Sequence, residues 1–174
     1  QGIVQDVSRI SYISYVSHLR RVNTPIDRSI KLVAPHRLDS PQYGMMCPIE
    51  SPDGSNIGLL KHMSATCEIT LESNRQDILN CLTELDVIFL EFVNPYSTKN
   101  STKVFLNNNW IGIHKTPKEL YDKMIKYRRH GILNTFVSIS WNIQENDIMI
   151  FCDSGRCCRP LIIAEQLKSM NYNL

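Results

Sequence analysis

The chain has 174 residues, of which 43% are hydrophobic and 21% are charged, and its formal net charge is +2. So small a positive excess excludes binding of a polyanion through overall charge, and any nucleic-acid role must come from local clustering of cations. The sequence starts without Met, shows no signal peptide and lacks an apolar run of about 18 residues. We therefore expect a segment of a larger soluble protein with no membrane partner.

The first predicted element is a helix over residues 3–21. Apolar side chains recur along it at steps of three and four: Ile3, Val7, Ile10, Ile13, Val16 and Leu19. The other positions are rich in Ser and Tyr, which have weak helix propensity, so this helix should depend on packing. The helix ends on Arg20 and Arg21, whose simplest role is to complement the negative end of the helix dipole.

Positive charge is concentrated in residues 18–37, in a part of the chain where prolines disfavour helix. This segment carries five cations, Arg20, Arg21, Arg28, Lys31 and Arg37, against one acid, Asp27. Its formal charge is therefore +4, while the other 154 residues sum to −2. Local basicity of this kind is what a phosphate-facing surface requires, and a solvated basic loop is the alternative explanation.

Residues 44–60, GMMCPIESPDGSNIGLL, place two acids among turn-forming residues. Prolines bracket the acids and prevent a regular helix, and Asp53-Gly54 after a proline is typical of a turn. Glu50 and Asp53 could bind a metal, accept hydrogen bonds from backbone amides, or pair with the arginines upstream. Pairing with arginine is the cheapest of these uses because the cations lie so near in sequence.

The rest of the chain predicts short strands and two helices. Strands are expected at 65–71, 87–93, 136–143 and 147–152, a helix at 75–85, and a hairpin at 103–115 that turns on Asn107-Asn108-Asn109. Thr116 should cap the next helix, with Pro117 at its first position and Glu119 completing a capping box. Gly131 should end that helix.

These elements predict an α+β fold with mixed helices and short antiparallel sheets, as a fragment of a larger subunit. The predicted domains are residues 1–72, with the basic segment and the acid-bearing turn, and residues 73–174.

No catalytic motif stands out in the sequence. A Gly-rich phosphate loop, an H-E-x-x-H helix and a nucleophile elbow are all missing. Six cysteines occur without a C-x-x-C pair, and we expect them to be reduced and mostly buried. An unrelated thiol enzyme is one alternative hypothesis, and it would need a cysteine whose pKa is lowered.

Several ordered motifs carry a family resemblance. S-H-L-R-R-V-N-T-P-I occupies 17–26, Y-G follows at 43–44, C-P-I-E-S-P-D-G at 47–54 and G-L at 58–59. Further on, V-F-x-N-x-x-W-x-G-x-H starts at 104 and D-x-G-R-x-x-R-P-L at 153. The first group closely resembles the fork region of the second-largest (beta-type) subunit of multisubunit DNA-dependent RNA polymerases, and the second resembles the adjoining external-1 domain. The amino-acid sequence of residues 29–44 favours a large cytoplasmic DNA virus, poxvirus-like or related, as the source.

The resemblance implies roles for single residues. It places Gln5, Arg20 and Arg21 beside the RNA–DNA hybrid. It places Arg28 and Lys31 on a loop that reaches toward downstream DNA.

The resemblance also implies an active-centre role for the turn. Asp53 would lie near the incoming nucleotide and Asn56 near RNA, with Glu50 in the same loop. Relatives often have Arg directly after the loop proline, whereas this chain has His36 followed by Arg37. Either of these two residues is therefore a candidate partner for Asp53.

At the level of the whole protein, the resemblance implies a DNA-directed RNA polymerase, a nucleotidyltransferase that acts as a complex. The segment would position the hybrid, downstream DNA and incoming nucleotide, with the largest subunit, other polymerase subunits, DNA template, RNA product and NTPs as partners. Catalytic Mg²⁺ would be held mainly by the largest subunit, so no catalytic or metal-binding residue is expected here and the segment should be inactive alone.

A viral enzyme would work in the host cytoplasm or virion and a cellular one in the nucleus. A stand-alone nucleic-acid-binding module without catalysis is the second alternative.

Overall fold

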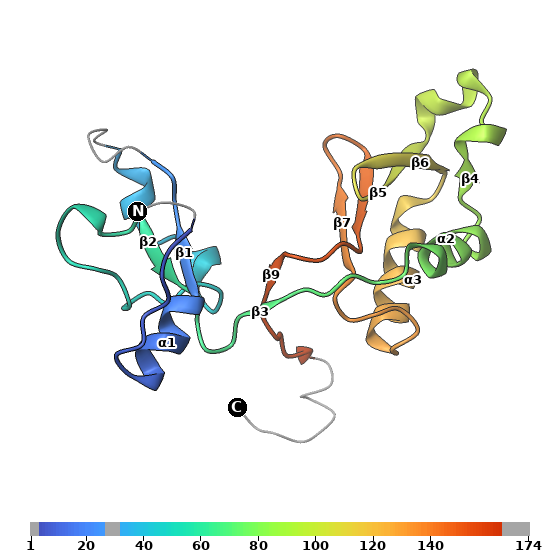
Figure 1. Ribbon diagram of the computed structural model, residues 1–174. Coiled ribbons are helices and arrows are strands. Elements are labelled where there is room, and N and C mark those ends of the chain that lie inside the picture. The colour runs from blue at the N-terminus through green and yellow to red at the C-terminus, as the bar shows by residue number, and fades with distance from the viewer. Residues whose placement is uncertain (1–3, 27–31, 165–174) are drawn as a thin grey trace. The chain divides into compact units, whose positions relative to one another are not determined.

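The computed structural model describes residues 4–26 and 32–164, and the chain divides into two compact units (Figure 1). Unit 1 consists of Gln1–Glu68 and Cys157–Leu174, and unit 2 consists of Ile69–Arg156. In sequence, unit 2 is therefore inserted between the two parts of unit 1. The described residues contain three α-helices and several small sheets, so the predicted α+β class is confirmed. The predicted domain boundary at residue 72 stays a prediction.

Helix α1 of unit 1, Tyr12–Leu19, is much shorter than the helix predicted over 3–21. Ser11 caps its N-terminus by accepting a hydrogen bond from the Ser14 amide at 3.1 Å. Residues 4–10 are not helical, and Ile10 and Ile13 are 92% and 79% exposed. The apolar stripe thus lacks a packing partner among the described residues. The helix instead starts where the Ser11 side chain can cap it.

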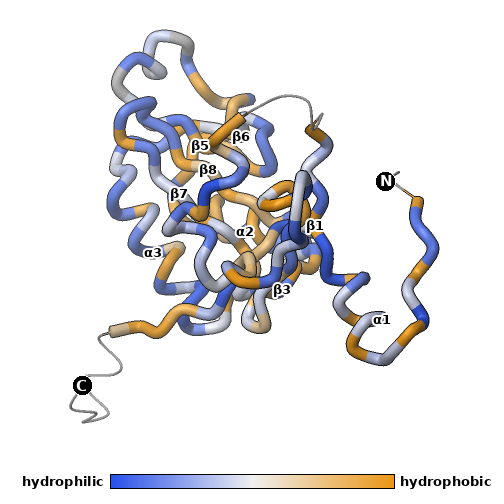
Figure 2. The backbone as a smooth tube through the Cα atoms, turned by 90° about the vertical axis from the view of Figure 1, so that its left-hand side faces the viewer, coloured by the Kyte–Doolittle hydropathy of each residue, from blue (hydrophilic) through white to orange (hydrophobic). Residues whose placement is uncertain are grey.

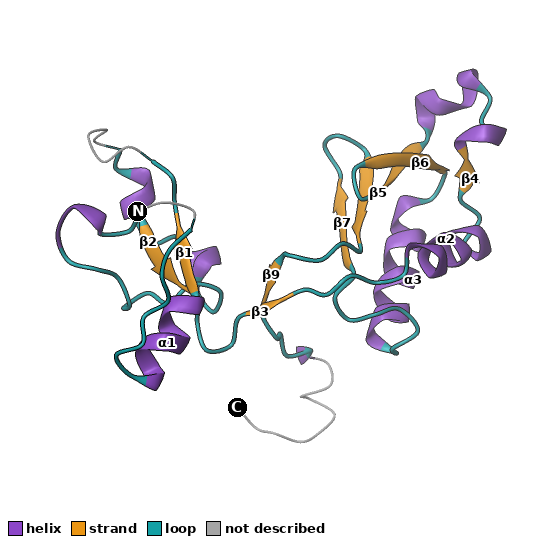
Figure 3. Ribbon diagram, in the orientation of Figure 1, coloured by secondary structure: helices purple, strands orange, loops and turns teal. Residues whose placement is uncertain are grey.

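Two short strands pair in unit 1 although about forty residues separate them in sequence. Strand β1, Arg21–Asn23, runs antiparallel to β2, Leu60–His62, with Arg21 opposite His62. Neither strand was predicted, because three residues are too few to show an alternating pattern. Loops and single turns of 3-10 helix form most of the rest of this unit, namely Ala34–His36, Ser40–Gln42 and Gly54–Asn56 (Figure 3).

A second pair of strands forms where the chain passes from one unit to the other. Strand β3, Glu68–Ile69, pairs with β9, Cys157–Cys158. The strand predicted over 65–71 therefore shrinks to two residues.

Unit 2 is built on a five-stranded sheet in the order β4-β6-β5-β8-β7. Its strands are β4 (Ile88–Phe89), β5 (Thr102–Leu106), β6 (Asn109–His114), β7 (Ser138–Asn142) and β8 (Asp147–Phe151). Strands β5 and β8 are parallel, and the other neighbours are antiparallel. The predicted hairpin is confirmed, and Asn107 and Asn108 make its turn with φ of +48° and +65°.

Two helices cover the same face of this sheet, α2 (Arg75–Glu84) and α3 (Pro117–Arg129). The core joins alternate residues of the central strands, Val104, Leu106, Ile148 and Ile150, to Ile78 and Leu82 of α2 and Leu120 and Met124 of α3. The apolar colour along β5 and β8 in Figure 2 follows this core. Both predicted helices are present, and for α3 the prediction rested on an amphipathic pattern that coincides with end signals.

Details at the ends of these elements differ from the prediction. Thr116 is the N-cap of α3 but makes no side-chain bond to the helix backbone; its hydroxyl donates to Glu119 Oε2 at 3.3 Å. The expected capping box is thus replaced by a side-chain pair. The strand predicted over 87–93 ends at Phe89, and a 3-10 turn, Leu90–Phe92, follows it. Another 3-10 segment, Pro95–Asn100, leads into the hairpin.

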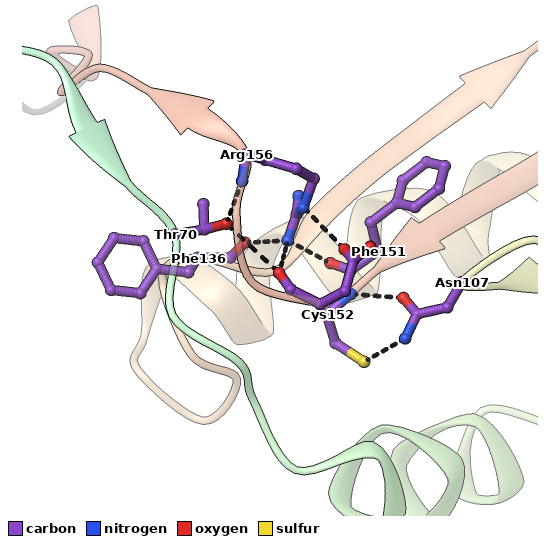
Figure 4. Close-up of polar contacts among 7 residues, drawn as sticks. Thr70, Asn107, Phe136, Phe151, Cys152 and Arg156 are labelled. Carbon is purple, nitrogen blue, oxygen red and sulfur yellow. Dashed lines mark hydrogen bonds and ion pairs between the residues drawn. The ribbon is translucent and has the colours of Figure 1, made fainter. Parts of the chain in front are cut away.

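Arg156 organises the end of unit 2 (Figure 4). Its Nη2 donates to the carbonyl oxygens of Phe136, Phe151 and Asp153 at 3.1, 3.2 and 2.9 Å. Its Nε lies 2.9 Å from Asp153 Oδ1 as an ion pair without hydrogen-bond alignment. Its backbone amide donates to the Thr70 hydroxyl at 3.0 Å, so one residue joins three separate segments of this unit.

Candidate nucleic-acid interface

Arg21 is a described cation of the basic segment whose side chain is exposed and held at one nitrogen. It is exposed at the start of β1, and its Nε donates a hydrogen bond to His62 Nε2 at 3.2 Å. Its two terminal amino groups bond to nothing among residues 4–26 and 32–164. One nitrogen therefore fixes the direction of the side chain, while the planar end of the guanidinium is left to bind an anion.

His62, which holds Arg21, is buried, with 6% of its surface exposed. Its Nδ1 lies 3.2 Å from the carbonyl oxygen of Glu50, which can only accept a hydrogen bond. Nδ1 must therefore carry the proton, and Nε2 is free to accept from Arg21. This pattern assigns a neutral imidazole with the proton on Nδ1.

The Glu50 carboxylate completes this polar network. Its Oε1 accepts from the Ser17 hydroxyl at 2.8 Å and lies 3.5 Å from His62 Nε2. Since that nitrogen is unprotonated, the second contact is not an ion pair in the arrangement described. Ser17 of α1, Arg21 of β1, Glu50 of the turn and His62 of β2 thus form one connected set, called here the His62 network.

Arg20, next to Arg21, makes its hydrogen bonds within the chain. Its Nη2 donates to the carbonyl oxygen of Ser64 and, at 3.5 Å, to that of Cys67. Its own carbonyl accepts from the Met63 amide at 2.9 Å. The half-buried guanidinium thus braces the segment after β2, which is a structural use of the charge.

Gln5 lies in the irregular segment before α1. His18 Nδ1 accepts from the Ser8 amide at 3.1 Å, so Nε2 carries the proton and donates to Gln5 Oε1, also at 3.1 Å. The exposed Gln5 side chain is therefore tethered to α1 through its oxygen.

The acid-bearing turn is shaped by the close passage of two backbone segments. Gly58 has φ of +73°, and a Cβ there would lie 2.7 Å from His36 Cα and 2.8 Å from the Pro35 carbonyl oxygen. The His36 ring donates through Nδ1 to the Ile57 carbonyl oxygen, and the Gly58 amide donates to the Ser51 hydroxyl at 3.1 Å. These contacts fix the turn without using either of its acids.

Asp53 lies at the exposed start of the 3-10 turn Gly54–Asn56. Its carboxylate forms no hydrogen bond or ion pair within the described part of the chain, and neither His36 nor Arg37 contacts it. Arg37 instead lines a surface pocket of about 400 Å³ with Val33, Ala34 and Asp39. Asn56, at the end of the turn, is half-buried.

Two predicted site residues cannot be placed, because Arg28 and Lys31 lie outside the described residues.

Two of the buried thiols, Cys67 and Cys81, lack the lowered pKa of an activated nucleophile. Burial raises the pKa of the Cys67 thiol, and the nearby Cys157 thiol raises it further. Burial likewise raises the pKa of the Cys81 thiol, with a smaller contribution from the charge of Glu84. A catalytic cysteine needs the opposite shift of its pKa.

Across the described chain, no group of three or more His, Cys, Asp or Glu residues could hold a metal ion. No helix of the described chain has the length and apolar character to cross a membrane.

Sequence reasoning missed His62, which joins Arg21 to the acid-bearing turn. A single histidine on a three-residue strand carries no motif, and only the pairing of β1 with β2 brings it opposite Arg21. The available signal was indirect: pairing with an upstream arginine was the cheapest of the three uses expected for Glu50. The carboxylate is instead held by Ser17 and stands beside His62.

Comparison with protein families assigns two stretches of the chain. Residues 5–69 match the family described as RNA polymerase Rpb2, domain 3, and residues 104–165 match RNA polymerase Rpb2, domain 4. The first stretch contains the His62 network and the acid-bearing turn, and the second contains most of the sheet and α3.

Individual relatives match across almost the whole chain. It is 39% identical over 164 residues to DNA-directed RNA polymerase II subunit RPB2 of Schizosaccharomyces pombe, covering 94% of this chain and 14% of that protein. It is 38% identical over 167 residues to DNA-directed RNA polymerase II subunit 2 of Arabidopsis thaliana, covering 96% and 14%. It is 33% identical over 166 residues to DNA-directed RNA polymerase subunit 2 of Acanthamoeba polyphaga mimivirus, covering 93% and 14%. The chain therefore spans about one seventh of the length of these relatives.

Proposed function

Since the chain belongs to the RNA polymerase Rpb2 family through successive domains 3 and 4, we propose that it is the part of a polymerase second subunit that holds nucleic acid near the active centre. In this proposal the complete enzyme is a DNA-directed RNA polymerase, a nucleotidyltransferase. The segment contributes positioning of the RNA–DNA hybrid, downstream DNA and incoming nucleotide, and the chemistry belongs to the assembled complex.

The observation that carries the proposal is the orientation of Arg21. An exposed guanidinium whose Nε is bonded to a buried imidazole has lost part of its rotamer freedom before any ligand arrives. Binding a phosphate then costs less ordering entropy than it would for a free surface arginine. Planar guanidinium groups also bind phosphate oxygens in a bidentate manner, which suits a contact with the backbone of the hybrid.

Arg21→Ala in the assembled polymerase is expected to shorten the lifetime of stalled elongation complexes at physiological salt. Loss of one phosphate contact should also reduce the magnitude of the slope of log lifetime against log salt by about 1. Lifetimes are measured as release of labelled RNA from complexes held at a series of KCl concentrations.

Three further variants separate charge from geometry. Arg21→Lys should keep the salt slope but lose part of the lifetime, because lysine lacks the Nε–H that His62 accepts. His62→Leu should act similarly, since the charge stays but its direction is free. Arg20→Ala should lower stability while leaving the salt slope near wild type. Equal salt slopes for Arg21→Ala and wild type would show that Arg21 makes no phosphate contact.

We assign Asp53 and Asn56 to the neighbourhood of the nucleotide and the RNA 3′ end. The support is that the Asp53 carboxylate is exposed and uncommitted within the described residues, on a turn whose shape is fixed by other groups. Glu50 supports this turn through Ser17, so in the proposal it is a positioning residue.

Gln5, Arg28 and Lys31 complete the proposed interface. Gln5 is proposed to contact RNA from its tether on His18, and Arg28 and Lys31 are proposed to face downstream DNA. The last two are cations of the +4 segment, which is their support.

The remaining assignments concern the whole enzyme. Mg²⁺ required for nucleotidyl transfer does not fit this segment, because the described residues lack a set of three potential ligands and Glu50 is already bonded to Ser17. We propose that the largest subunit holds the metal and that this subunit, other polymerase subunits, DNA, RNA and NTPs are the partners. The mimivirus relative supports a viral source, which would place transcription in the host cytoplasm, while a cellular source would place it in the nucleus.

A further inference from the structure

Three cysteines meet beside the short sheet formed by β3 and β9. Cys67 directly precedes β3, and Cys157 and Cys158 make up β9. The Cys158 thiol donates to the Glu68 carbonyl oxygen at 3.5 Å, and the Cys67 thiol approaches the same oxygen at 3.8 Å. The Cys157 thiol lies near enough to Cys67 to help raise the pKa of the Cys67 thiol. All three are free thiols that belong to unit 1.

The members of this cluster differ in access to solvent. Cys67 is buried, with 3% of its surface exposed, whereas Cys157 and Cys158 are half-buried. Burial and the neighbouring Cys157 thiol both raise the pKa of Cys67, which disfavours its thiolate form. Cys157 is the better placed to meet a soluble oxidant, and Cys67 is the thiol nearest to resolve the product.

We propose that Cys67 and Cys157 are a redox modification site that closes to a reversible disulfide when a small peroxide oxidises it. The Cys157 thiolate attacks one oxygen of hydrogen peroxide, the O–O bond breaks, and hydroxide leaves to take up a proton as water. The resulting sulfenic acid is attacked at sulfur by Cys67, an S–S bond forms, and a second water leaves. Two thiols are oxidised by two electrons in total, and one peroxide is reduced to two waters.

The position of this pair in the chain gives the bond a defined effect. A link between residues 67 and 157 would join the two ends of the segment that contains all of unit 2, Ile69–Arg156. It would also cross-link next to the Cys67 carbonyl oxygen that Arg20 braces at 3.5 Å. Oxidation would therefore link the two places where the chain passes between unit 1 and unit 2, and the bond would use no residue of the His62 network.

The test is disulfide mapping in the assembled polymerase. The enzyme is treated with a small excess of hydrogen peroxide, free thiols are alkylated, and proteolytic peptides are compared before and after reduction. The expected result is a linked pair containing Cys67 on one peptide and Cys157 on the other, two hydrogens lighter than the separate peptides and released by dithiothreitol.

Matched variants locate the bond. Cys67→Ser and Cys157→Ser should each abolish the linked pair, while Cys158→Ser should keep it. Cys81→Ser is the control, since Cys81 is also buried with a raised pKa but is not in this cluster, and it should keep the linked pair. Fragmentation of the wild-type linked peptide distinguishes Cys157 from Cys158 if a variant fails to assemble. A Cys157–Cys158 bond, a Cys67–Cys158 bond, or peroxide-treated enzyme with Cys67 still fully alkylated would each overturn the proposal.

Discussion

Gly58→Ala is expected to destabilise unit 1 by about 3 kcal/mol or more, through two separate effects. Alanine is strained at the native φ of +73°, and its Cβ would lie 2.7 Å from His36 Cα and 2.8 Å from the Pro35 carbonyl oxygen. Both of those atoms belong to the backbone, so relief requires the two segments to separate. The Ile57 carbonyl would then lose its bond from His36, and the turn that carries Asp53 would lose its shape.

Gly54 provides the matched control within the same turn. Its φ is +81°, close to that of Gly58, but a Cβ there meets nothing within 4 Å. Gly54→Ala should therefore cost only the backbone strain, about 1–2 kcal/mol. Hydrogen exchange of the amides in β1 and β2 reports on unit 1 directly. Equal loss of protection in the two variants would show that the close approach at Gly58 contributes nothing.

Arg156→Ala is expected to lower the free energy of unfolding of unit 2 by about 2–4 kcal/mol. The substitution removes one donor group that serves three carbonyl oxygens, from Phe136, Phe151 and Asp153. It also removes a guanidinium stacked 5.9 Å from the centre of the Phe151 ring. The chain's two tryptophans, Trp110 and Trp141, both belong to unit 2, so urea unfolding followed by their fluorescence measures this loss.

Two further variants, Arg156→Lys and Arg75→Ala, serve as comparisons for the stability of Arg156→Ala. Arg156→Lys should recover little of the stability, because a single ammonium cannot reproduce the fixed fork of the guanidinium. Arg75→Ala, at the exposed first residue of α2, should stay within about 0.5 kcal/mol of wild type. A loss at Arg156 no larger than that at Arg75 would mean that the three carbonyls find other partners.

The structure of unit 2 was largely predictable from sequence because its signals are local. The turn at Asn107 and Asn108 tolerates positive φ, and Pro117 and Gly131 mark the two ends of one amphipathic helix. Each of these signals acts within a few residues, where no distant contact is needed to decide the conformation. Even here, the side chain of Thr116 bonds to Glu119 and not to the backbone, since both arrangements satisfy the same hydroxyl.

Unit 1 was harder to predict because its decisive contacts join residues far apart in sequence. The apolar stripe predicted a helix from residue 3, but the chain becomes helical only after the Ser11 cap. Arg20 and Arg21 were indistinguishable in sequence. Their contacts differ, because Arg20 donates to the carbonyl oxygen of Ser64 and Arg21 donates to His62. Both of these partners belong to strand β2 or to the residues that follow it.

Photocrosslinking from RNA tests the central claim that this segment lies along the hybrid at the active centre. Stalled polymerase complexes are assembled with RNA that carries one photoreactive base, either at the 3′ end or a few nucleotides upstream within the hybrid. The 3′-terminal base should label the 53–56 turn, and the upstream base should label the neighbourhood of Arg21. Labelling of both kinds in other parts of an active enzyme, with none in residues 5–69, would contradict the account.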